Sequence, residues 1–114
     1  MRIERFEDIE AWKNAKEMTL MLYEVMKDNN DYAFKNQILR ASVSVMNNIA
    51  EGFERRTNNE FKHFLYISKG SAGEVRSMLY LAGELKYIDE VKCKSIFELS
   101  LIVSKMLANF IKKL

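Results

Sequence analysis

Apolar residues recur every three to four positions along almost the whole chain, which is the period of amphipathic α-helices. Polar clusters at residues 28–31 and 57–60 interrupt this pattern, and Asp89 precedes its last stretch. The pattern therefore predicts four helices. Their expected ranges are about Asp8 to Lys27, Asp31 to Arg55 or Arg56, Asn58 to Lys86, and the residues that follow Asp89.

Side chains that accept hydrogen bonds from free backbone N–H groups stand where these helices should begin. Asp8, Asp31 and Asp89 are the expected N-caps of the first, second and fourth helices. Thr57 followed by Glu60 has the form of a capping box for the third helix. Because the loops between helices are short, consecutive helices should pack antiparallel in an up-down-up-down four-helix bundle, a single all-α domain over residues 1–114.

Three of the helices show one apolar stripe each. In the first it contains Trp12, Ala15, Thr19, Leu22, Tyr23 and Met26. In the third it contains Phe61, Phe64, Leu65, Ser68, Ala72, Val75, Leu79 and Ala82. In the fourth it contains Ile96, Leu99, Val103, Leu107, Phe110 and Leu114. Each stripe should face the common core.

The second helix is apolar over about 200° of its circumference, where a core-facing stripe needs little more than 100°. Either the neighbouring helices wrap this helix deeply, or part of the arc contacts another copy of the protein. We expect a homo-oligomer. The expected interface residues are Leu39, Val43, Met46, Ala50 and Phe53.

Composition narrows the protein class. The 114 residues include no proline and a single cysteine, so no internal disulfide forms, as is usual in a reducing cytoplasm. No apolar run is long enough to span a membrane, and the first residues do not resemble a signal peptide. We expect a cytoplasmic protein. The net charge is only +2, but residues 35–76 hold seven Lys or Arg against four Asp or Glu.

Few residues suggest catalysis. Glu60 and His63 have the spacing of a di-iron ligand pair, but His63 is the only histidine and a second pair cannot form. Cys93 is expected to be a small residue of the fourth helix and not a reactive thiol. Arg56 and His63 resemble the Arg-x(4–6)-His signature of HEPN ribonucleases, in which Arg stabilises phosphate charge and His transfers a proton. We expect no enzyme and no cofactor, with this ribonuclease as the alternative.

The third helix carries a row of cations. Lys62, Lys69 and Arg76 recur every seven residues, with Tyr66, Gly73 and Tyr80 between them on nearly the same face. Cations neutralise phosphates and tyrosines stack on unpaired bases, so this row is a candidate nucleic-acid interface, to which Arg40, Arg55 and Arg56 can add charge. An ordinary solvated helix face is the alternative. A close approach of another helix or subunit, and not contact with a ligand, is expected around Ser68, Gly70, Ser71, Ala72 and Gly73.

The sequence resembles a known bacterial family in several segments. These are Arg40-Ala41-Ser42-Val43-Ser44-Val45, Asn48-Ile49-Ala50-Glu51-Gly52-Phe53, Arg55-Arg56, Glu60-Phe61, Phe64-Leu65-Tyr66-Ile67 and Gly70-Ser71, with the opening Phe6-Glu7-Asp8-Ile9-Glu10-Ala11-Trp12-Lys13-Asn14-Ala15 and Leu85-Lys86-Tyr87-Ile88. They are similar to the S23-like proteins associated with intervening sequences of 23S rRNA.

The resemblance implies a left-handed bundle that commonly assembles as a pentamer. It also implies a relation to the accessory variability determinant of retroelements, which binds nucleic acid and a reverse transcriptase. Met46 stands where the family often has proline, so a proline kink is not expected in the second helix. A non-catalytic, oligomeric RNA-binding accessory module is the leading hypothesis, and a scaffold that binds only protein is a further alternative.

Overall fold

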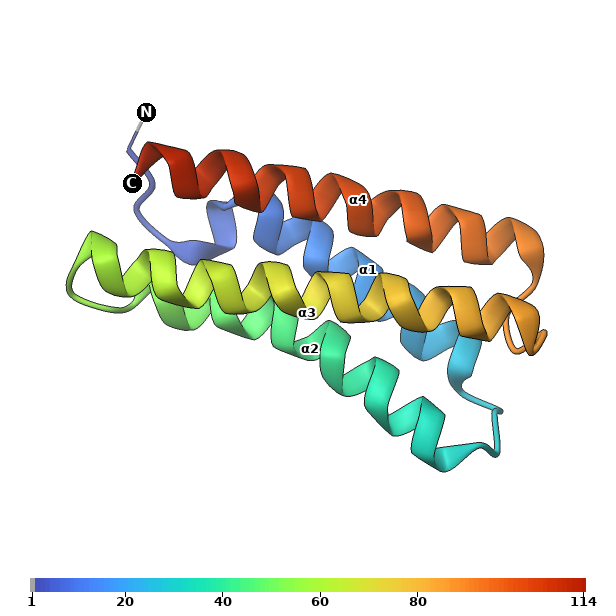
Figure 1. Cartoon of the computed structure of the whole chain (residues 1–114). Helices are drawn as coiled ribbons and strands as arrows, with labels where there is room; N and C mark the ends of the chain where they lie inside the picture. The colour runs from blue at the N-terminus through green and yellow to red at the C-terminus, as the bar shows by residue number, and fades with distance from the viewer. Residues whose placement is uncertain (1) are drawn as a thin grey trace.

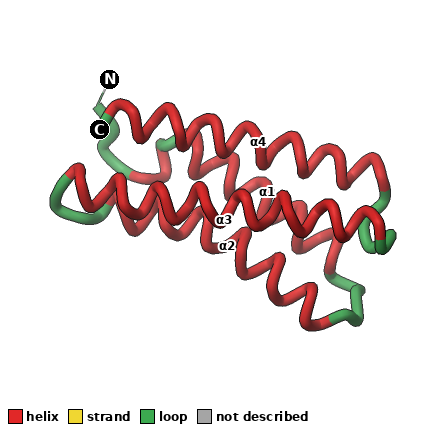
Figure 2. Tube along the Cα trace, in the orientation of Figure 1, coloured by secondary structure: helices red, strands yellow, loops and turns green. Residues whose placement is uncertain are grey.

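The computed structural model describes residues 2–114, in which every regular element is a helix (Figure 2). Four long helices follow a short 3₁₀ helix, as the sequence predicts. The elements are η1 (Phe6–Asp8), α1 (Glu10–Met26), α2 (Tyr32–Phe53), α3 (Asn58–Glu84) and α4 (Glu90–Lys113). The expected all-α class is confirmed, and the predicted helix boundaries are correct to within about two residues in most places.

Consecutive helices run in opposite directions, and the two chain ends lie together at one end of the bundle (Figure 1). α1 and α3 each pack against α2 and α4, so α1 and α3 lie across the core from one another. The bundle measures 42 × 23 × 19 Å. The up-down-up-down arrangement places the outer surfaces of α3 and α4 on the side opposite the outer surfaces of α1 and α2. The left-handed sense of the bundle stays a prediction.

Three of the four predicted N-caps are present. Asp31 accepts a hydrogen bond from the Phe34 N–H, and Asp89 accepts one from the Lys92 N–H. Thr57 and Glu60 form the complete capping box. The prediction for Asp8 is wrong, because this residue belongs to η1 and Ile9 occupies the N-cap of α1 without a side-chain cap.

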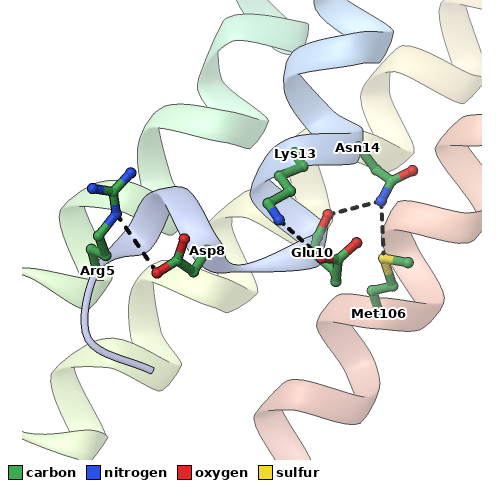
Figure 3. Close-up of polar contacts among 6 residues, drawn as sticks. All are labelled: Arg5, Asp8, Glu10, Lys13, Asn14 and Met106. Atoms are coloured by element: carbon green, nitrogen blue, oxygen red, sulfur yellow. Dashed lines mark hydrogen bonds and ion pairs between the residues drawn. The ribbon is translucent and has the colours of Figure 1, made fainter. Parts of the chain in front are cut away.

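α1 is fixed to its neighbours by polar contacts as well as by its apolar stripe. The Asn14 side-chain amide donates to Glu10 O at 2.8 Å and approaches Met106 Sδ of α4 at 3.6 Å (Figure 3). On the α2 side, the hydroxyl groups of Thr19 and Ser42 are hydrogen-bonded at 2.8 Å in the core. These contacts set the register of α1 against both adjacent helices.

The core consists of the predicted stripes with local corrections. Tyr23 is wrong as a core residue, because its side chain is 49% exposed. Trp12, Phe64, Leu99 and Phe110 are only partly buried. In α1 and α4 the centre of the buried face is rotated slightly from the predicted one, so the sequence analysis missed several buried positions, namely Ala11, Met18, Ser100 and Ile111.

The broad apolar arc of α2 is largely covered within the chain. Its members are either buried or half-buried, and none is among the exposed large hydrophobic side chains. Leu39, expected at an interface, is only 8% exposed. Deep wrapping by neighbouring helices, the first of the two alternatives, therefore accounts for most of the arc. α2 continues without interruption through Met46.

Among the glycines, the closest approach of another helix occurs at Gly52 and not in α3. A Cβ atom at Gly52 would lie 2.7 Å from Phe64 Cβ and 2.9 Å from Phe61 Cδ1. At Gly70 an added Cβ would meet nothing within 4 Å, and at Gly73 it would meet only the Arg76 guanidinium at 3.6 Å. Within one chain the expected close approach is therefore absent at Gly70 and Gly73. It is present at two other residues of this stretch, since Ser68 Oγ donates to Val45 O at 2.6 Å and the Ser71 and Ser44 hydroxyl groups are hydrogen-bonded at 2.9 Å.

The two loops at the end of the bundle remote from the termini are joined by a side-chain hydrogen bond. The Tyr87 hydroxyl donates to Asp31 Oδ2 at 2.6 Å, which lowers the pKa of the Asp31 carboxyl and raises the pKa of Tyr87. The N–H groups of Lys86 and Tyr87 satisfy carbonyls of the last turn of α3. Lys86 adopts a left-handed conformation with φ of 60°, where glycine is usual.

Candidate nucleic-acid interface

The predicted cation row lies on the flank of α3 that borders α4. Lys69 is exposed and Lys62 is half-buried. Tyr66 and Tyr80 are 61% and 64% exposed. The Tyr80 ring packs edge-on against Phe97 of α4, with centroids 5.2 Å apart. The row therefore borders α4 at Arg76 and Tyr80, while Tyr66 and Lys69 are exposed.

Arg76 has a different role from the two lysines. Its Nη1 atom donates to Ser104 Oγ at 2.6 Å and approaches Ser100 O at 3.5 Å, both on α4. The guanidinium is half-buried between the helices. Its charge remains near the surface, but its donors hold α3 and α4 in register. Arg76 is thus a structural cation within the predicted row.

The fold adds lysines of α4 that the sequence analysis missed. Phe97 and Ser104 mark the edge of α4 that faces α3, since they contact Tyr80 and Arg76. Next to this edge, on the outer surface of α4, lie three exposed lysines, Lys94, Lys105 and Lys112. Lys105 and Lys112 are seven residues apart, as are Lys62 and Lys69 of α3. This repeated spacing was the signal in the sequence that could have identified the α4 lysines.

We define the α3–α4 face by its lysines and exposed tyrosines, which are Lys62, Tyr66, Lys69, Tyr80, Lys94, Lys105 and Lys112. Among the residues that the structure describes, none of these lysines forms an ion pair with a carboxylate. By contrast, Lys13 of α1 and Lys27 at the C-cap of α1 are paired with Glu10 and Glu24 at 3.2 and 3.1 Å. Glu98 follows Phe97 in α4, and Glu84, Asp89 and Glu90 line the hollow that Tyr80 and Lys94 also line. The lysines of this face form no ion pair, but its end near Tyr80 also carries carboxylates.

Arg55 and Arg56 lie at the end of the bundle where the α2–α3 loop meets the two termini. The Arg55 guanidinium stacks over the Phe64 ring at 4.9 Å and lies 4.0 Å from Glu51 Oε2. Arg56 lines a hollow of about 370 Å³ together with Arg2 and Arg55, and no acidic residue lines it. This end is a basic extension beyond the start of α3.

Arg40 is separated from the other predicted binding residues. On α2 it lies between Gln37 and Ser44, which hydrogen-bond to Glu74 and Ser71 on the α2-facing flank of α3. The lysine row occupies the opposite flank of α3, beside α4. The structure therefore brings together Lys62, Tyr66, Lys69 and Arg76, places Arg55 and Arg56 at one end, and leaves Arg40 on another side.

The candidate catalytic residues are not gathered around one hollow. Glu60 takes part in the capping box, as the simpler interpretation predicts. His63 is exposed and does not line the hollow that contains Arg56. Its ring packs edge-on against Phe64 at 5.6 Å. Within residues 2–114 no three His, Cys, Asp or Glu side chains are arranged to hold a metal ion.

Cys93 is half-buried at the other end of the α3–α4 contact. Its thiol lies 3.4 Å from the Leu79 carbonyl oxygen, and burial, reinforced by nearby Asp89, raises its pKa. A hollow of about 790 Å³ opens beside it between the end of α3 and the start of α4. A thiol with a raised pKa is less often in the reactive thiolate form.

The residues expected at an oligomer interface follow the side of α2 that borders α1. Val43, Met46, Ala50 and Phe53 are half-buried there. Since the Thr19–Ser42 hydrogen bond fixes the antiparallel register, the exposed side chains of Leu20 and Tyr23 lie near this row, at the level of Ala41 and Ile38. We define the α1–α2 flank as Leu20, Tyr23, Leu39, Val43, Met46, Ala50 and Phe53.

No helix within residues 2–114 combines the length and apolar character needed to cross a bilayer.

Comparisons with known proteins place the chain in a family. No curated protein matches the sequence. A crystal structure of a protein of unknown function from the S23 ribosomal protein family of Bacteroides thetaiotaomicron has the same fold, with a TM-score of 0.83 and 24% sequence identity over 90% of this chain and 98% of that one. The family model of the 23S rRNA-intervening sequence protein matches residues 7–109. The chain therefore belongs to the 23S rRNA-intervening sequence protein family.

Proposed function

We propose that this protein is a non-catalytic RNA-binding module that uses the α3–α4 face. The observation that carries the proposal is the set of lysines on two adjacent helices that have no carboxylate partner within the described residues. The family's name, which refers to an intervening sequence in ribosomal RNA, supports RNA as the ligand. The expected placement in the cytoplasm is consistent with this role.

Electrostatics supplies the affinity in this proposal. Each lysine that approaches a phosphate releases condensed counterions, so binding should weaken steeply as salt rises. Lys62 and Lys69 on α3 lie beside the α4 lysines, and the basic end with Arg55 and Arg56 continues the surface. One chain presents only a modest number of such contacts, so a single copy should bind weakly.

Self-association would raise the affinity by repeating this face. We propose that copies associate through the α1–α2 flank, where Leu20 and Tyr23 are 55% and 49% exposed. Because α1 lies across the core from α3, an assembly formed on this flank leaves the α3–α4 face accessible. Several weak RNA contacts then act together through multivalency. The pentamer that the family resemblance implies is the assembly we expect.

A protein partner completes the proposed accessory role. The resemblance described above implies a relation to the retroelement accessory variability determinant, and on that ground we propose a reverse transcriptase or another protein as the partner. The oligomer would then hold RNA and partner in one particle. A scaffold that binds only protein predicts the same self-association but no salt-sensitive retention of RNA.

Charge reversal tests the RNA proposal. The variant Lys62→Glu/Lys69→Glu should lose most RNA retention at low salt, because each change replaces an attraction to phosphate by a repulsion. The matched control is Lys13→Glu/Lys27→Glu in α1 and at its C-cap, which changes the net charge equally on the opposite side of the bundle. Equal retention by the wild-type protein and the α3 variant would show that another surface binds RNA, or none.

The same samples test the absence of catalysis. RNA recovered from the wild-type complex should be intact, whether single-stranded or structured. Cleavage that disappears in His63→Ala would instead favour the ribonuclease hypothesis, in spite of the separation between His63 and the hollow lined by Arg56.

Sedimentation tests the assembly. The wild-type protein should sediment as an oligomer at micromolar concentration, and Leu20→Glu/Tyr23→Glu should shift it towards the monomer, because both side chains are exposed in the single chain. Val91→Glu/Ile67→Glu is the control, since it alters two exposed apolar residues of α4 and α3. A wild-type protein that stays monomeric would refute the proposed assembly.

A further inference from the structure

Two exposed tyrosines accompany the lysines of the α3–α4 face. Tyr66 and Tyr80 stand fourteen positions apart on α3, which is about 21 Å along the helix axis at 1.5 Å per residue. Fourteen residues are close to four full turns, so the two rings point to the same side of the helix. Lys69 lies between them on this side and Lys62 lies just before Tyr66. Ring and cation therefore alternate along one line.

The surroundings of Tyr80 hold its ring at the surface. The ring contacts Phe97 at an interplanar angle of 78°, an edge-on arrangement that leaves the side chain 64% exposed. One turn earlier, Arg76 is hydrogen-bonded to Ser104. These contacts fix the flank of α3 on which Tyr80 stands, so less side-chain freedom is lost when a ligand stacks on the ring.

The helix surface between the tyrosines is open to a close ligand. Gly73 lies midway between Tyr66 and Tyr80 and carries no side chain, and only the Arg76 guanidinium lies within 4 Å of a Cβ built there. A flat base or a sugar can approach the helix backbone at this point. The face from Lys62 to Tyr80 extends over about 27 Å at 1.5 Å per residue.

These features discriminate between forms of RNA. In an A-form duplex the bases stack on one another and the major groove is too deep and narrow for side chains to enter, so an exposed ring finds no free base face. In a single strand each unpaired base has a face on which an aromatic ring can stack. We propose that the α3–α4 face binds single-stranded RNA, with Tyr66 and Tyr80 as stacking platforms and Lys62 and Lys69 on its phosphates. This inference rests on the proposed function.

The test compares oligouridine of about ten nucleotides with an RNA duplex of the same length, using fluorescence anisotropy at fixed low salt. The wild-type protein should bind the single strand more tightly than the duplex. Tyr66→Leu and Tyr80→Leu should each weaken single-strand binding by about tenfold or more, because the ring is lost. Binding to the duplex should stay nearly unchanged.

Two controls separate stacking from other effects. Tyr66→Phe and Tyr80→Phe keep the ring and should retain single-strand binding. Tyr32→Leu removes an exposed tyrosine from α2, away from the face, and should bind as the wild type does. Circular dichroism of each leucine variant checks that the bundle is folded.

The outcomes distinguish this inference from the proposed function. If Lys62→Glu/Lys69→Glu abolishes RNA binding but the leucine variants bind oligouridine like the wild type, the stacking inference is overturned and the proposed function stands. A wild-type preference for the duplex also overturns it. If the wild-type protein binds neither RNA at low salt, the proposed function fails and this inference fails with it.

Discussion

Replacing Gly52 by alanine should destabilise the bundle, although alanine is the better helix former. In the folded chain the new Cβ would lie 2.7 Å from Phe64 Cβ, 2.9 Å from Phe61 Cδ1 and 3.3 Å from the Phe61 carbonyl oxygen. Two of these atoms are attached directly to the backbone or belong to it, so rotation of a side chain does not relieve the clash. α2 and α3 must move apart.

The magnitude follows from two opposing effects. Overpacking a tight contact costs about 1–3 kcal/mol, and the rigid neighbours favour the upper part of this range. Alanine in place of glycine recovers at most about 1 kcal/mol of helix propensity, less near the end of a helix such as α2. The free energy of unfolding should therefore fall by about 2 kcal/mol in Gly52→Ala.

Urea unfolding followed by circular dichroism measures this change, at one protein concentration for all variants because self-association adds to apparent stability. Gly70→Ala is the matched control, since an added Cβ there meets nothing within 4 Å. It should stabilise the protein by up to about 1 kcal/mol. A Gly52→Ala variant as stable as the wild type would refute the close approach of α2 and α3 at this residue.

Three further predictions concern the ends of the helices. Lys86→Gly should raise the free energy of unfolding by about 1 kcal/mol, because glycine adopts the left-handed conformation without steric cost; unchanged stability in urea would contradict this. Asp31 accepts hydrogen bonds from Tyr87 and the Phe34 N–H, which lower its pKa, so its stabilising contribution is present above the ordinary carboxyl pKa and is lost as pH falls through the lower, folded-state value. Asp31→Asn should flatten the acid side of the curve of stability against pH, and a curve parallel to that of the wild type would argue against the bond. Because burial raises the pKa of the Cys93 thiol, iodoacetamide at mildly alkaline pH should modify it more slowly in the folded than in the urea-unfolded protein, and equal rates would show that the thiol is accessible.

The features predicted best from the sequence are those set by neighbouring residues. Helix periodicity, the Asp31 and Asp89 caps and the Thr57–Glu60 capping box depend on a few consecutive positions, and all were found in the structure. The prediction of Asp8 as an N-cap was wrong because an extra 3₁₀ turn precedes α1, and Ile9 occupies the N-cap position without a polar side chain. Local preference is therefore a good guide to the helices and a weaker one to their first residues.

Contacts between distant segments were beyond the sequence analysis. The lysines of α4 join those of α3 only because Arg76 and Tyr80 fix how α4 is rotated against α3. The bond between Asp31 and Tyr87 joins residues 56 positions apart. The apolar arc of α2 suggested an exposed interface, yet neighbouring helices cover most of it. The sequence analysis could not predict this, because the pattern along one helix does not show how deeply the neighbouring helices cover it.

The salt dependence of RNA affinity tests the central claim most directly. For single-stranded RNA, the logarithm of the binding constant should fall linearly with the logarithm of the salt concentration, by about 0.7 for each phosphate contact. Lys62→Ala/Lys69→Ala should reduce the steepness of this line by about 1.4 for each chain that contacts the RNA, because each such chain loses two contacts. Parallel lines for the variant and the wild type would contradict the account, because the lysines of α3 would then contact no phosphate.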